Sequence, residues 1–438
     1  MRFIGPLAAV FLFACASTPP KQPAEPPAPR VDPASTASPP VRVPPPEVAV
    51  ERLAPPAVAY AHGWMPLAST GADGFVRQHP TFDGRGVLIA ILDTGVDPGV
   101  PGLRTTSTGA PKLVDVRDFS GEGTVPLTRV TPRGDTVLVA GRKLGGFGRV
   151  VALSTTGPWY AGTLVERTLG EAPASDLDGD GEADDTLAVV VTKATDGWVL
   201  LADTDGDGSL AGERPVRDYL VGREAFGWAP RGRAPAVNLA ANLSERAGEP
   251  VLDLVFALDA HGTHVAGIAA AHDLYGVSGF DGVAPGAQLL GLKISDRANG
   301  SVSTSGAILA AMDYAIRFAG ARRLPLVLNL SFGVGNEREG DARIDRLVDS
   351  VLAAHPEIVL TVAAGNDGPG LSTLGIPGSA RRAISVGGTV PSVFLPPDRG
   401  GAAADIVADF SARGGEMAKP DIMAPGVAYS SVPLWNAG

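Results

Sequence analysis

Apolar residues recur along the chain in two alternating patterns. Strands are predicted for short apolar runs at 87–92, 289–294, 326–330, 358–363 and 383–387. Helices are predicted for 261–271, for 304–320 and for the apolar stripe that begins at Ile344. Strands that alternate with helices predict an α/β fold, with a doubly wound, mostly parallel sheet and helices on both of its faces.

The pattern changes between about 105 and 257. Short β-type runs at 136–140, 187–192 and 198–202 are separated there by turns rich in glycine and aspartate. Thr195-Asp196-Gly197, between two of these runs, is typical of a β-hairpin turn. We therefore predict a mainly β insertion at about 105–257.

The first residues have the pattern of an export signal. Arg2 precedes an apolar run that ends at Cys15, and this run is shorter than the about 20 residues that span a bilayer. The stretch before Cys15 resembles a bacterial lipobox, in which the cysteine becomes the lipidated first residue. We expect 1–15 to direct export and to anchor the protein to the bacterial cell envelope. A plainly cleaved signal and an incidental cysteine in a buried apolar start are the alternatives.

The segment 16–59 is rich in proline and alanine, a composition that favours an extended, disordered stalk. The folded domain is expected from residue 60 to 438. The net charge of −11 and the lack of a Lys/Arg cluster argue against a nucleic-acid partner. The single cysteine excludes an intrachain disulfide framework.

Three polar motifs interrupt the apolar pattern. Asp93 follows a predicted strand, His261 begins a predicted helix of small residues, and Asn366 lies where another strand turns. Each residue alone is commonly structural, as a cap, a satisfied histidine or a turn. Together they suit acyl transfer, in which a buried aspartate orients a histidine base and an amide stabilises an oxyanion.

These motifs resemble the subtilisin-like serine peptidases, the subtilases. The resemblance extends over 84–438 outside the insertion, and it rests on the segments Gly-Val-Ala-Pro-Gly-Ala at 282–287, Asn-Leu-Ser-Phe-Gly at 329–333 and Lys-Pro-Asp-Ile-Met-Ala-Pro-Gly at 419–426. It implies a subtilisin-like fold and peptide-bond hydrolysis by an Asp-His-Ser triad. An extended peptide or protein substrate is therefore expected, and no cofactor is required.

The resemblance also assigns roles residue by residue. It makes Asp93 the triad aspartate, His261 the base and Asn366 the oxyanion donor, while His264 is a packing residue. The backbone of the substrate is expected to pair with Ser331, Phe332 and Gly333. Ala364 and Gly365 are expected to line the primary pocket, and 300–302 the opposite rim.

A closer similarity is to the tripeptidyl peptidase II branch, carried by the segment 83–99 and by the long spacing between the aspartate and histidine motifs. That branch binds the free amino group of its substrate with acidic side chains. The corresponding positions fall near Ser303 and Val334, and neither residue is acidic. We therefore expect an endopeptidase, with a tripeptidyl exopeptidase as the alternative.

The nucleophile of the family is missing from the sequence. The family's serine lies in a Gly-Thr-Ser motif after the Ala-Pro-Gly turn, and Ser430 and Ser431 lack that context. We expect the serine just beyond Gly438, so the chain as printed should not hydrolyse peptides by the serine mechanism. The competing hypothesis is an inactive surface lipoprotein that uses the fold as a peptide-binding module.

Two acidic turns in the insertion resemble the first half of a calcium loop. One contains Asp176, Asp178 and Asp180, and the other contains Asp203, Asp205 and Asp207. The bidentate glutamate that normally closes such a loop is absent from both. A structural calcium ion and ordinary acidic turns therefore both remain open.

Overall fold

The computed structural model describes eight stretches of the chain. They are 65–146, 155–166, 185–229, 237–257, 259–296, 302–336, 338–395 and 404–433. All of them belong to the unit Pro46–Gly438. The predicted signal with Cys15, the predicted stalk and the acidic turn at 176–180 lie outside the described residues. No helix within those eight stretches is long and apolar enough to cross a membrane.

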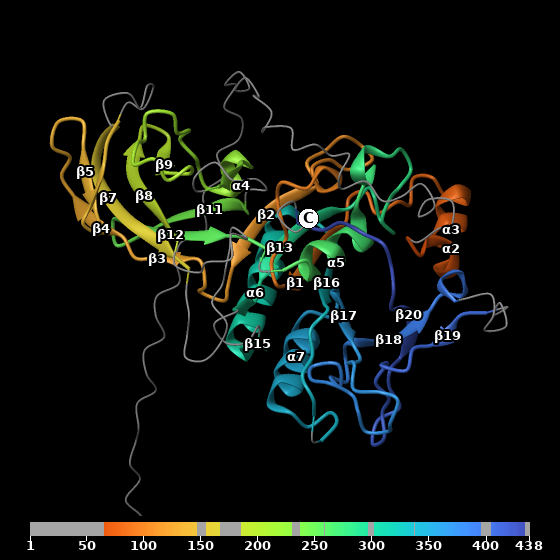
Figure 1. The fold of residues 1–438 in the computed structure, drawn as a ribbon. Helices are drawn as coiled ribbons and strands as arrows, with labels where there is room; N and C mark the ends of the chain where they lie inside the picture. Colours follow the sequence, from red (N-terminus) through yellow and green to blue (C-terminus); the bar gives the residue numbers. More distant parts are fainter. Residues whose placement is uncertain are drawn as a thin grey trace, which may run out of the picture. The chain divides into compact units, whose positions relative to one another are not determined.

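An eight-stranded sheet forms the centre of this unit (Figure 1). Its main path runs β19-β18-β17-β16-β1-β13-β2, and β20 pairs with β18. All neighbours are parallel except β18 and β19. The strands are β1 (Leu88–Asp93), β2 (Leu113–Asp118), β13 (Gln288–Lys293), β16 (Leu326–Leu330), β17 (Val359–Ala363), β18 (Ile384–Val390), β19 (Ile406–Val407) and β20 (Ile422–Pro425). The predicted α/β fold and the five predicted strands are confirmed.

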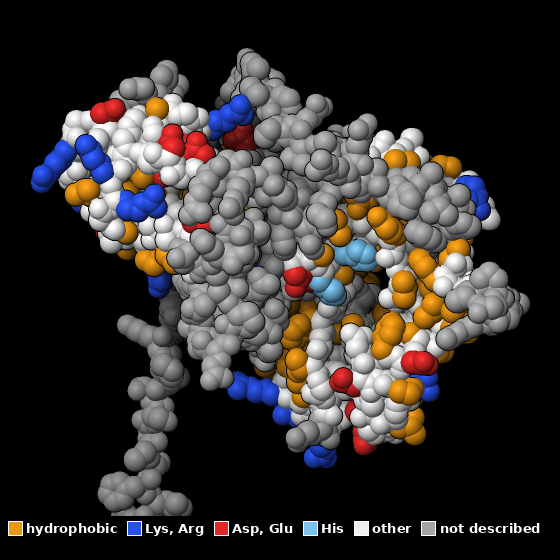
Figure 2. All heavy atoms as spheres, viewed as in Figure 1, with side chains coloured by type: hydrophobic (Ala, Val, Ile, Leu, Met, Phe, Trp, Pro, Cys, Tyr) orange, Lys and Arg blue, Asp and Glu red, His pale blue; other side chains and the backbone are white. Residues whose placement is uncertain are grey.

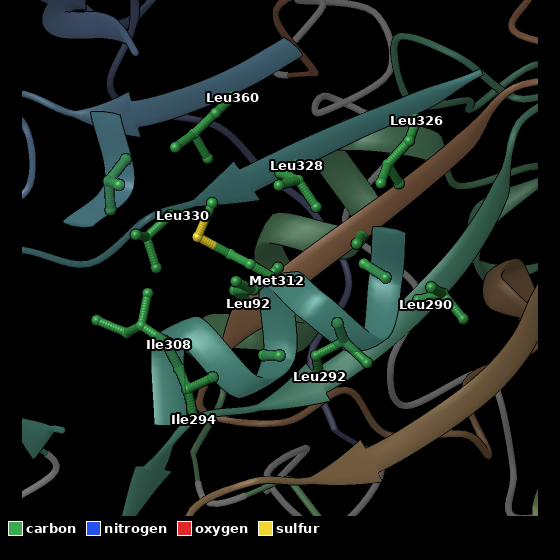
Figure 3. Packing of buried hydrophobic residues seen from close by; sticks show 14 of the residues in the cluster. Leu92, Leu290, Leu292, Ile294, Ile308, Met312, Leu326, Leu328, Leu330 and Leu360 are labelled. Atoms are coloured by element: carbon green, nitrogen blue, oxygen red, sulfur yellow. The ribbon is translucent and has the colours of Figure 1, made fainter. Parts of the chain in front are cut away.

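Helices cover both faces of the sheet because the side chains of each strand alternate between the faces. Leu88, Ala90 and Leu92 of β1 pack with α6 (Ser305–Arg322) and α7 (Arg343–Ala354), as part of the core drawn in Figure 3. Ile91 points to the opposite face, where it packs with α5 (His261–Ala270). Strand β1 is therefore buried on both sides, which explains its continuous apolar run.

Local signals in the sequence set the ends of the longest helix. The Thr304 side chain accepts a hydrogen bond from Ala307 N at 3.0 Å and caps the start of α6. Arg323 ends the helix in the left-handed conformation, with φ of 54°. Two short helices, α2 (Leu67–Thr70) and α3 (Ala72–Gln78), precede β1.

The β-rich part of the chain begins later than expected. Strand β2 lies within the predicted insertion at 105–257, but it pairs with β13 in the main sheet. The residues after Asp118 form two four-stranded sheets, ordered β4-β7-β8-β9 and β10-β11-β12-β3, and a β5-β6 hairpin. The two four-stranded sheets share one apolar core, in which Val189 and Leu239 are fully buried. The predicted hairpin at Thr195 joins β8 to β9, with Ala194 opposite Gly197.

The remaining elements are short or belong to this β-rich part. The strands are β3 (Thr124–Val125), β4 (Thr128–Val130), β5 (Val137–Val139), β6 (Arg142–Leu144), β7 (Thr155–Val165), β8 (Thr186–Ala194), β9 (Gly197–Ala202), β10 (Ala225–Trp228), β11 (Val237–Arg246), β12 (Glu249–Val255), β14 (Ser295–Asp296) and β15 (Val302–Ser303). The helices are α4 (Tyr219–Gly222) and the 3₁₀ turns η2 (Pro101–Leu103), η5 (Leu274–Gly276) and η7 (Ser392–Phe394).

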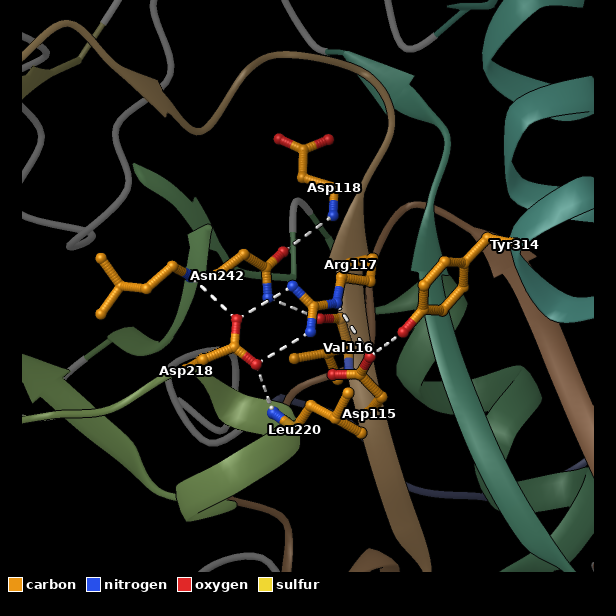
Figure 4. Close-up of polar contacts among 9 residues, drawn as sticks. Asp115, Val116, Arg117, Asp118, Asp218, Leu220, Asn242 and Tyr314 are labelled. Carbon is orange, nitrogen blue, oxygen red and sulfur yellow. Dashed lines mark hydrogen bonds and ion pairs between the residues drawn. The ribbon is translucent and has the colours of Figure 1, made fainter. Parts of the chain in front are cut away.

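A buried polar network joins the β-rich part to the main sheet (Figure 4). Arg117 of β2 donates to Asp115 at 2.8 Å and to both carboxylate oxygens of Asp218 at 3.0 and 2.9 Å. Tyr314 of α6 donates its hydroxyl to Asp115, and Asn242 of β11 donates to the Val116 carbonyl. We call these residues the Arg117 network. It connects β2, α6 and β11 through hydrogen bonds that are largely buried.

Candidate active site

Asp93 and His261 meet at the carboxyl end of strand β1. Asp93 is the last residue of β1, and His261 is the first residue of α5, which packs against that strand. The His261 Nδ1 atom lies 2.7 Å from Asp93 Oδ1. Parallel strands end on one edge of a sheet, so a helix that starts beside that edge brings its first side chain to the strand end. The structure thus brings together the two residues that the sequence predicted as a catalytic pair.

The two side chains differ in their access to water. The Asp93 side chain is 2% exposed, whereas the His261 side chain is 54% exposed. The hydrogen bond to Asp93 raises the pKa of His261 above its ordinary value, burial opposes this rise, and the charges of Asp93 and Asp259 add to it. On the face of the molecule shown in Figure 2, histidine side chains lie at the surface beside an acidic side chain. The pair therefore combines a buried carboxylate with a base that solvent can reach.

Contacts around the pair fix the orientation of the carboxylate. Thr94 N donates to Asp93 Oδ1 at 2.8 Å, so this oxygen accepts from both Thr94 and the imidazole. The other oxygen, Oδ2, is buried and accepts no hydrogen bond from the described residues. Within that part of the chain, the hydrogen bonds that Asp93 accepts thus all lie on the oxygen that faces His261.

His264 lies one turn further along α5 and points elsewhere. Its Nε2 atom lies 3.3 Å from the Ala428 carbonyl. Burial lowers the pKa of His264, and the nearby charge of His261 adds to this effect. A neutral ring that contacts a backbone carbonyl fits the packing role predicted for this residue.

Asn366 lies on the same edge of the sheet, after the end of β17. Its side chain is exposed, and no hydrogen bond within the described residues links it to His261. The residues before it are fixed: Ala364 N donates to Val386 O at 2.9 Å, and Gly365 O accepts from Ala412 N at 3.1 Å. The φ of 117° at Gly365 favours glycine and turns the chain out of the strand.

The predicted substrate-pairing residues follow strand β16, which lies between β1 and β17. Ser331 is oriented by a hydrogen bond from Asn329 Nδ2 at 2.9 Å, and Phe332 packs against the main core. Gly333 is exposed, and Val334 exchanges backbone hydrogen bonds with Ile376. The edge of the sheet thus carries, in order, the Asp93 strand, the predicted substrate strand and the Asn366 turn. The predicted rim residues 300 and 301 lie outside the described residues.

Ser430 and Ser431 are buried against helix α5, with 3% and 0% of their surface exposed. Ser430 Oγ donates to the His264 carbonyl at 2.9 Å, and Ser431 Oγ donates to the Thr263 carbonyl at 2.7 Å. Their contact with the helix depends on Gly267, where a Cβ atom would lie 2.3 Å from each hydroxyl. Both hydroxyls are therefore committed to the helix backbone. Among the described residues no hydroxyl is hydrogen-bonded to His261 Nε2.

The acidic turn with Asp203, Asp205 and Asp207 is the described half of the calcium prediction. One carboxylate oxygen from each lies within 4.8 Å of the others. Asp203 accepts from Gly208 N, and Asp207 accepts from Ser209 N, as in an ordinary acidic turn. Calcium binding here stays a prediction.

Sequence reasoning missed two polar residues beside the pair, Thr94 and Asp259. Thr94 Oγ1 lies 2.7 Å from Asp259 Oδ1, and Asp259 Oδ1 also accepts from His261 N at 2.8 Å. The available signal was an aspartate two residues before the histidine that begins a helix. This signal was weak, because aspartate is common before any helix.

Comparison with known proteins gives the family. The chain is 29% identical over 457 residues to tripeptidyl-peptidase 2 of Oryza sativa subsp. japonica, covering 86% of the chain and 32% of that protein. It is 30% identical over 440 residues to pyrolysin of Pyrococcus furiosus, covering 82% of the chain and 30% of that protein. The chain thus spans about a third of the length of these relatives.

A solved structure agrees on the fold. The crystal structure of tripeptidyl peptidase 2 superposes with a TM-score of 0.59 at 23% identity, over 75% of this chain and 30% of that one. The family model for the subtilase family matches residues 84–436, which include Asp93, His261 and Asn366. The chain therefore belongs to the subtilase family.

Proposed function

We propose that the gene product hydrolyses internal peptide bonds as a serine endopeptidase. The observation that carries this proposal is the 2.7 Å contact between His261 Nδ1 and the buried Asp93. This contact favours the tautomer in which Nδ1 carries the proton, which leaves Nε2 free to accept one. The exposed part of the ring can then receive the proton of an attacking serine hydroxyl.

In the proposed reaction the serine oxygen attacks the peptide carbonyl carbon while His261 Nε2 takes its proton. Asp93 stays ionised and stabilises the imidazolium, and the Asn366 amide donates to the developing oxyanion. His261 then gives the proton to the leaving amine, and water hydrolyses the acyl-enzyme. Because Ser430 and Ser431 bond to the α5 backbone, the nucleophile of this proposal is the serine expected beyond Gly438.

The choice of an endopeptidase rests on Ser303 and Val334. A protein that clamps a free amino group needs acidic side chains, and neither the half-buried Ser303 nor the exposed Val334 supplies one. The test is cleavage of a quenched ten-residue peptide by the full-length gene product, with its amino terminus either free or acetylated. We expect both forms to be cleaved, and His261→Ala to reduce cleavage at least about a thousandfold. Loss of cleavage upon acetylation would show a tripeptidyl exopeptidase instead.

The peptide-binding hypothesis predicts a different result. An inactive module would bind the peptide without cleaving it, and the coding sequence beyond Gly438 would lack Gly-Thr-Ser. The Asp93–His261 pair favours the enzyme, because peptide binding alone does not require a histidine oriented by a buried carboxylate.

We also propose that Cys15 carries a lipid that anchors the protein to the bacterial cell envelope. The support is the sequence of 1–15 and the proline-rich spacer that follows. Metabolic labelling with a radioactive fatty acid tests this: the full chain should be labelled, and Cys15→Ser should not. Equal labelling of both would refute the anchor.

A further inference from the structure

We propose that Asp259 is a positioning residue for the catalytic pair, a role that rests on the proposed function. Asp259 precedes α5 and has no place in the Asp-His-Ser scheme. One of its oxygens, Oδ1, contacts one half of the pair and the neighbour of the other: it accepts from His261 N at 2.8 Å and from the hydroxyl of Thr94 at 2.7 Å. Thr94 directly follows Asp93 at the end of β1. Asp259 thus ties the strand of the aspartate to the helix of the base.

The hydroxyl of Thr94 completes this connection. Its oxygen accepts a hydrogen bond from Gly262 N at 3.1 Å, so the same group also touches the first turn of α5. A hydroxyl has a single proton, and two carboxylate oxygens lie within its reach: Asp259 Oδ1 at 2.7 Å and Asp93 Oδ1 at 3.3 Å. The shorter contact indicates that the Thr94 hydroxyl donates its hydrogen bond to Asp259.

The acceptor that the Thr94 hydroxyl chooses affects His261, the proposed base. Asp93 Oδ1 is the oxygen that accepts from His261 Nδ1, and no described residue donates to Oδ2. If the Thr94 hydroxyl turned to Asp93, it would compete with the imidazole for that single oxygen. A further donor on this oxygen, beside Thr94 N and the imidazole, weakens its attraction for the imidazolium. Asp259 therefore keeps the Asp93 oxygen available to His261.

The charged groups around His261 determine in which direction its pKa should change when Asp259 is replaced. Asp93 faces the ring from β1 and Asp259 from the segment before α5, and both raise the pKa of His261. His264 lies on α5 itself, and burial lowers its pKa. The buried Lys293 of β13 is oriented towards the Thr94 carbonyl, and its charge is paired with Glu122 at 2.8 Å.

Two substitutions separate the two parts of this role. Asp259→Asn removes the charge but keeps an oxygen that accepts from His261 N and from Thr94. Asp259→Ala removes the oxygen as well, so the Thr94 proton is free to turn to Asp93. We expect the pKa of His261 to fall in Asp259→Asn and to fall further in Asp259→Ala. An ordinary helix cap would change stability without this ordered change in pKa.

The first experiment measures that pKa directly in the 438-residue chain. Its six histidines can be labelled with ¹³C in the ring and titrated by NMR, with His261→Gln to assign the signal. Asp313→Asn is the matched control, because Asp313 is 63% exposed on α6 and its side chain pairs with Arg317. The proposal is overturned if His261 titrates alike in the wild type, the control and both Asp259 variants.

The second experiment measures kcat and KM against pH in the full-length gene product. His261 must be neutral to act as a base, so the acidic limb of kcat should move to lower pH in the Asp259 variants. On the plateau, Asp259→Ala should lower kcat about tenfold, with KM nearly unchanged, because positioning is lost and not binding. If the wild type cleaves no peptide, the proposed function fails while the NMR titration still decides the role of Asp259.

Combining Thr94→Val with the Asp259 substitutions tests whether the Thr94 hydroxyl transmits the effect of Asp259 on the pKa of His261. Without the Thr94 hydroxyl, Asp259→Ala and Asp259→Asn should have the same effect on the pKa of His261. If the two still differ in the Thr94→Val background, the hydroxyl does not transmit the effect and this step is refuted.

Discussion

Replacing Arg117 with methionine should destabilise the folded chain more than the loss of an exposed ion pair would. Arg117 donates three hydrogen bonds of 2.8 to 3.0 Å to two carboxylates. Asp115 is fully buried, and the Asp218 side chain is 14% exposed. Removing one partner of a buried pair costs about 3–5 kcal/mol, because the remaining charge is left uncompensated. Water near Asp218 relieves part of this cost, so we expect the lower end of that range.

The change should also depend on pH. Burial raises the pKa of Asp115, and the positive charge of Arg117 opposes this rise. Without Arg117 the folded state binds a proton on Asp115 more tightly than the unfolded chain does. Its stability then falls as the pH rises through that pKa. The destabilisation by Arg117→Met should therefore be larger at pH 8 than at pH 5.

Urea denaturation followed by tryptophan fluorescence measures both effects. Arg77→Met is the control, because Arg77 is 71% exposed in its pair with Asp73 and its replacement should leave the stability nearly unchanged. A triple variant, Arg117→Met with Asp115→Asn and Asp218→Asn, carries no buried charge and should recover part of the loss. The reasoning is refuted if Arg117→Met costs less than about 1 kcal/mol, or if the triple variant is less stable than Arg117→Met alone.

Three further outcomes are expected. Lys112 is fully buried, and burial lowers its pKa from 10.5 to about 7. The unfolding free energy should therefore rise from pH 7 to pH 10 by up to about 1.4 kcal/mol per pH unit. Lys112→Met should abolish this rise in urea titrations, and an equal dependence of the unfolding free energy on pH in the two proteins would contradict it. Gly267→Ala should cost about 1–3 kcal/mol in thermal unfolding, because its Cβ would meet two buried hydroxyls, whereas Gly320→Ala, with open space around it, should cost nothing. Asn366→Leu should lower kcat of the full-length enzyme about 10²- to 10³-fold, the range already known for the oxyanion amide of a subtilisin, and an unchanged kcat would remove Asn366 from the mechanism.

The sequence was most informative where one physical signal dominated. Strand β16 was predicted at its observed bounds, because a mostly apolar run of 5 residues suits a buried strand and is too short for a typical helix. The insertion boundary was wrong because β2 ends in Arg117 and Asp118, so its charged end resembles a loop. Only its pairing with β13 shows that it belongs to the main sheet.

The sequence by itself determined the α/β pattern, the motifs around Asp93, His261 and Asn366, and the family they indicate. Local order along the chain is enough for these, because apolar periodicity and motif residues are properties of short segments. The tertiary structure alone decided that Asp93 and His261 touch, that Ser430 and Ser431 are bonded to α5, and that Asp259 contacts Thr94, the residue after Asp93. These contacts join residues distant along the chain, and strand order and helix packing fix such distances, which no local pattern encodes.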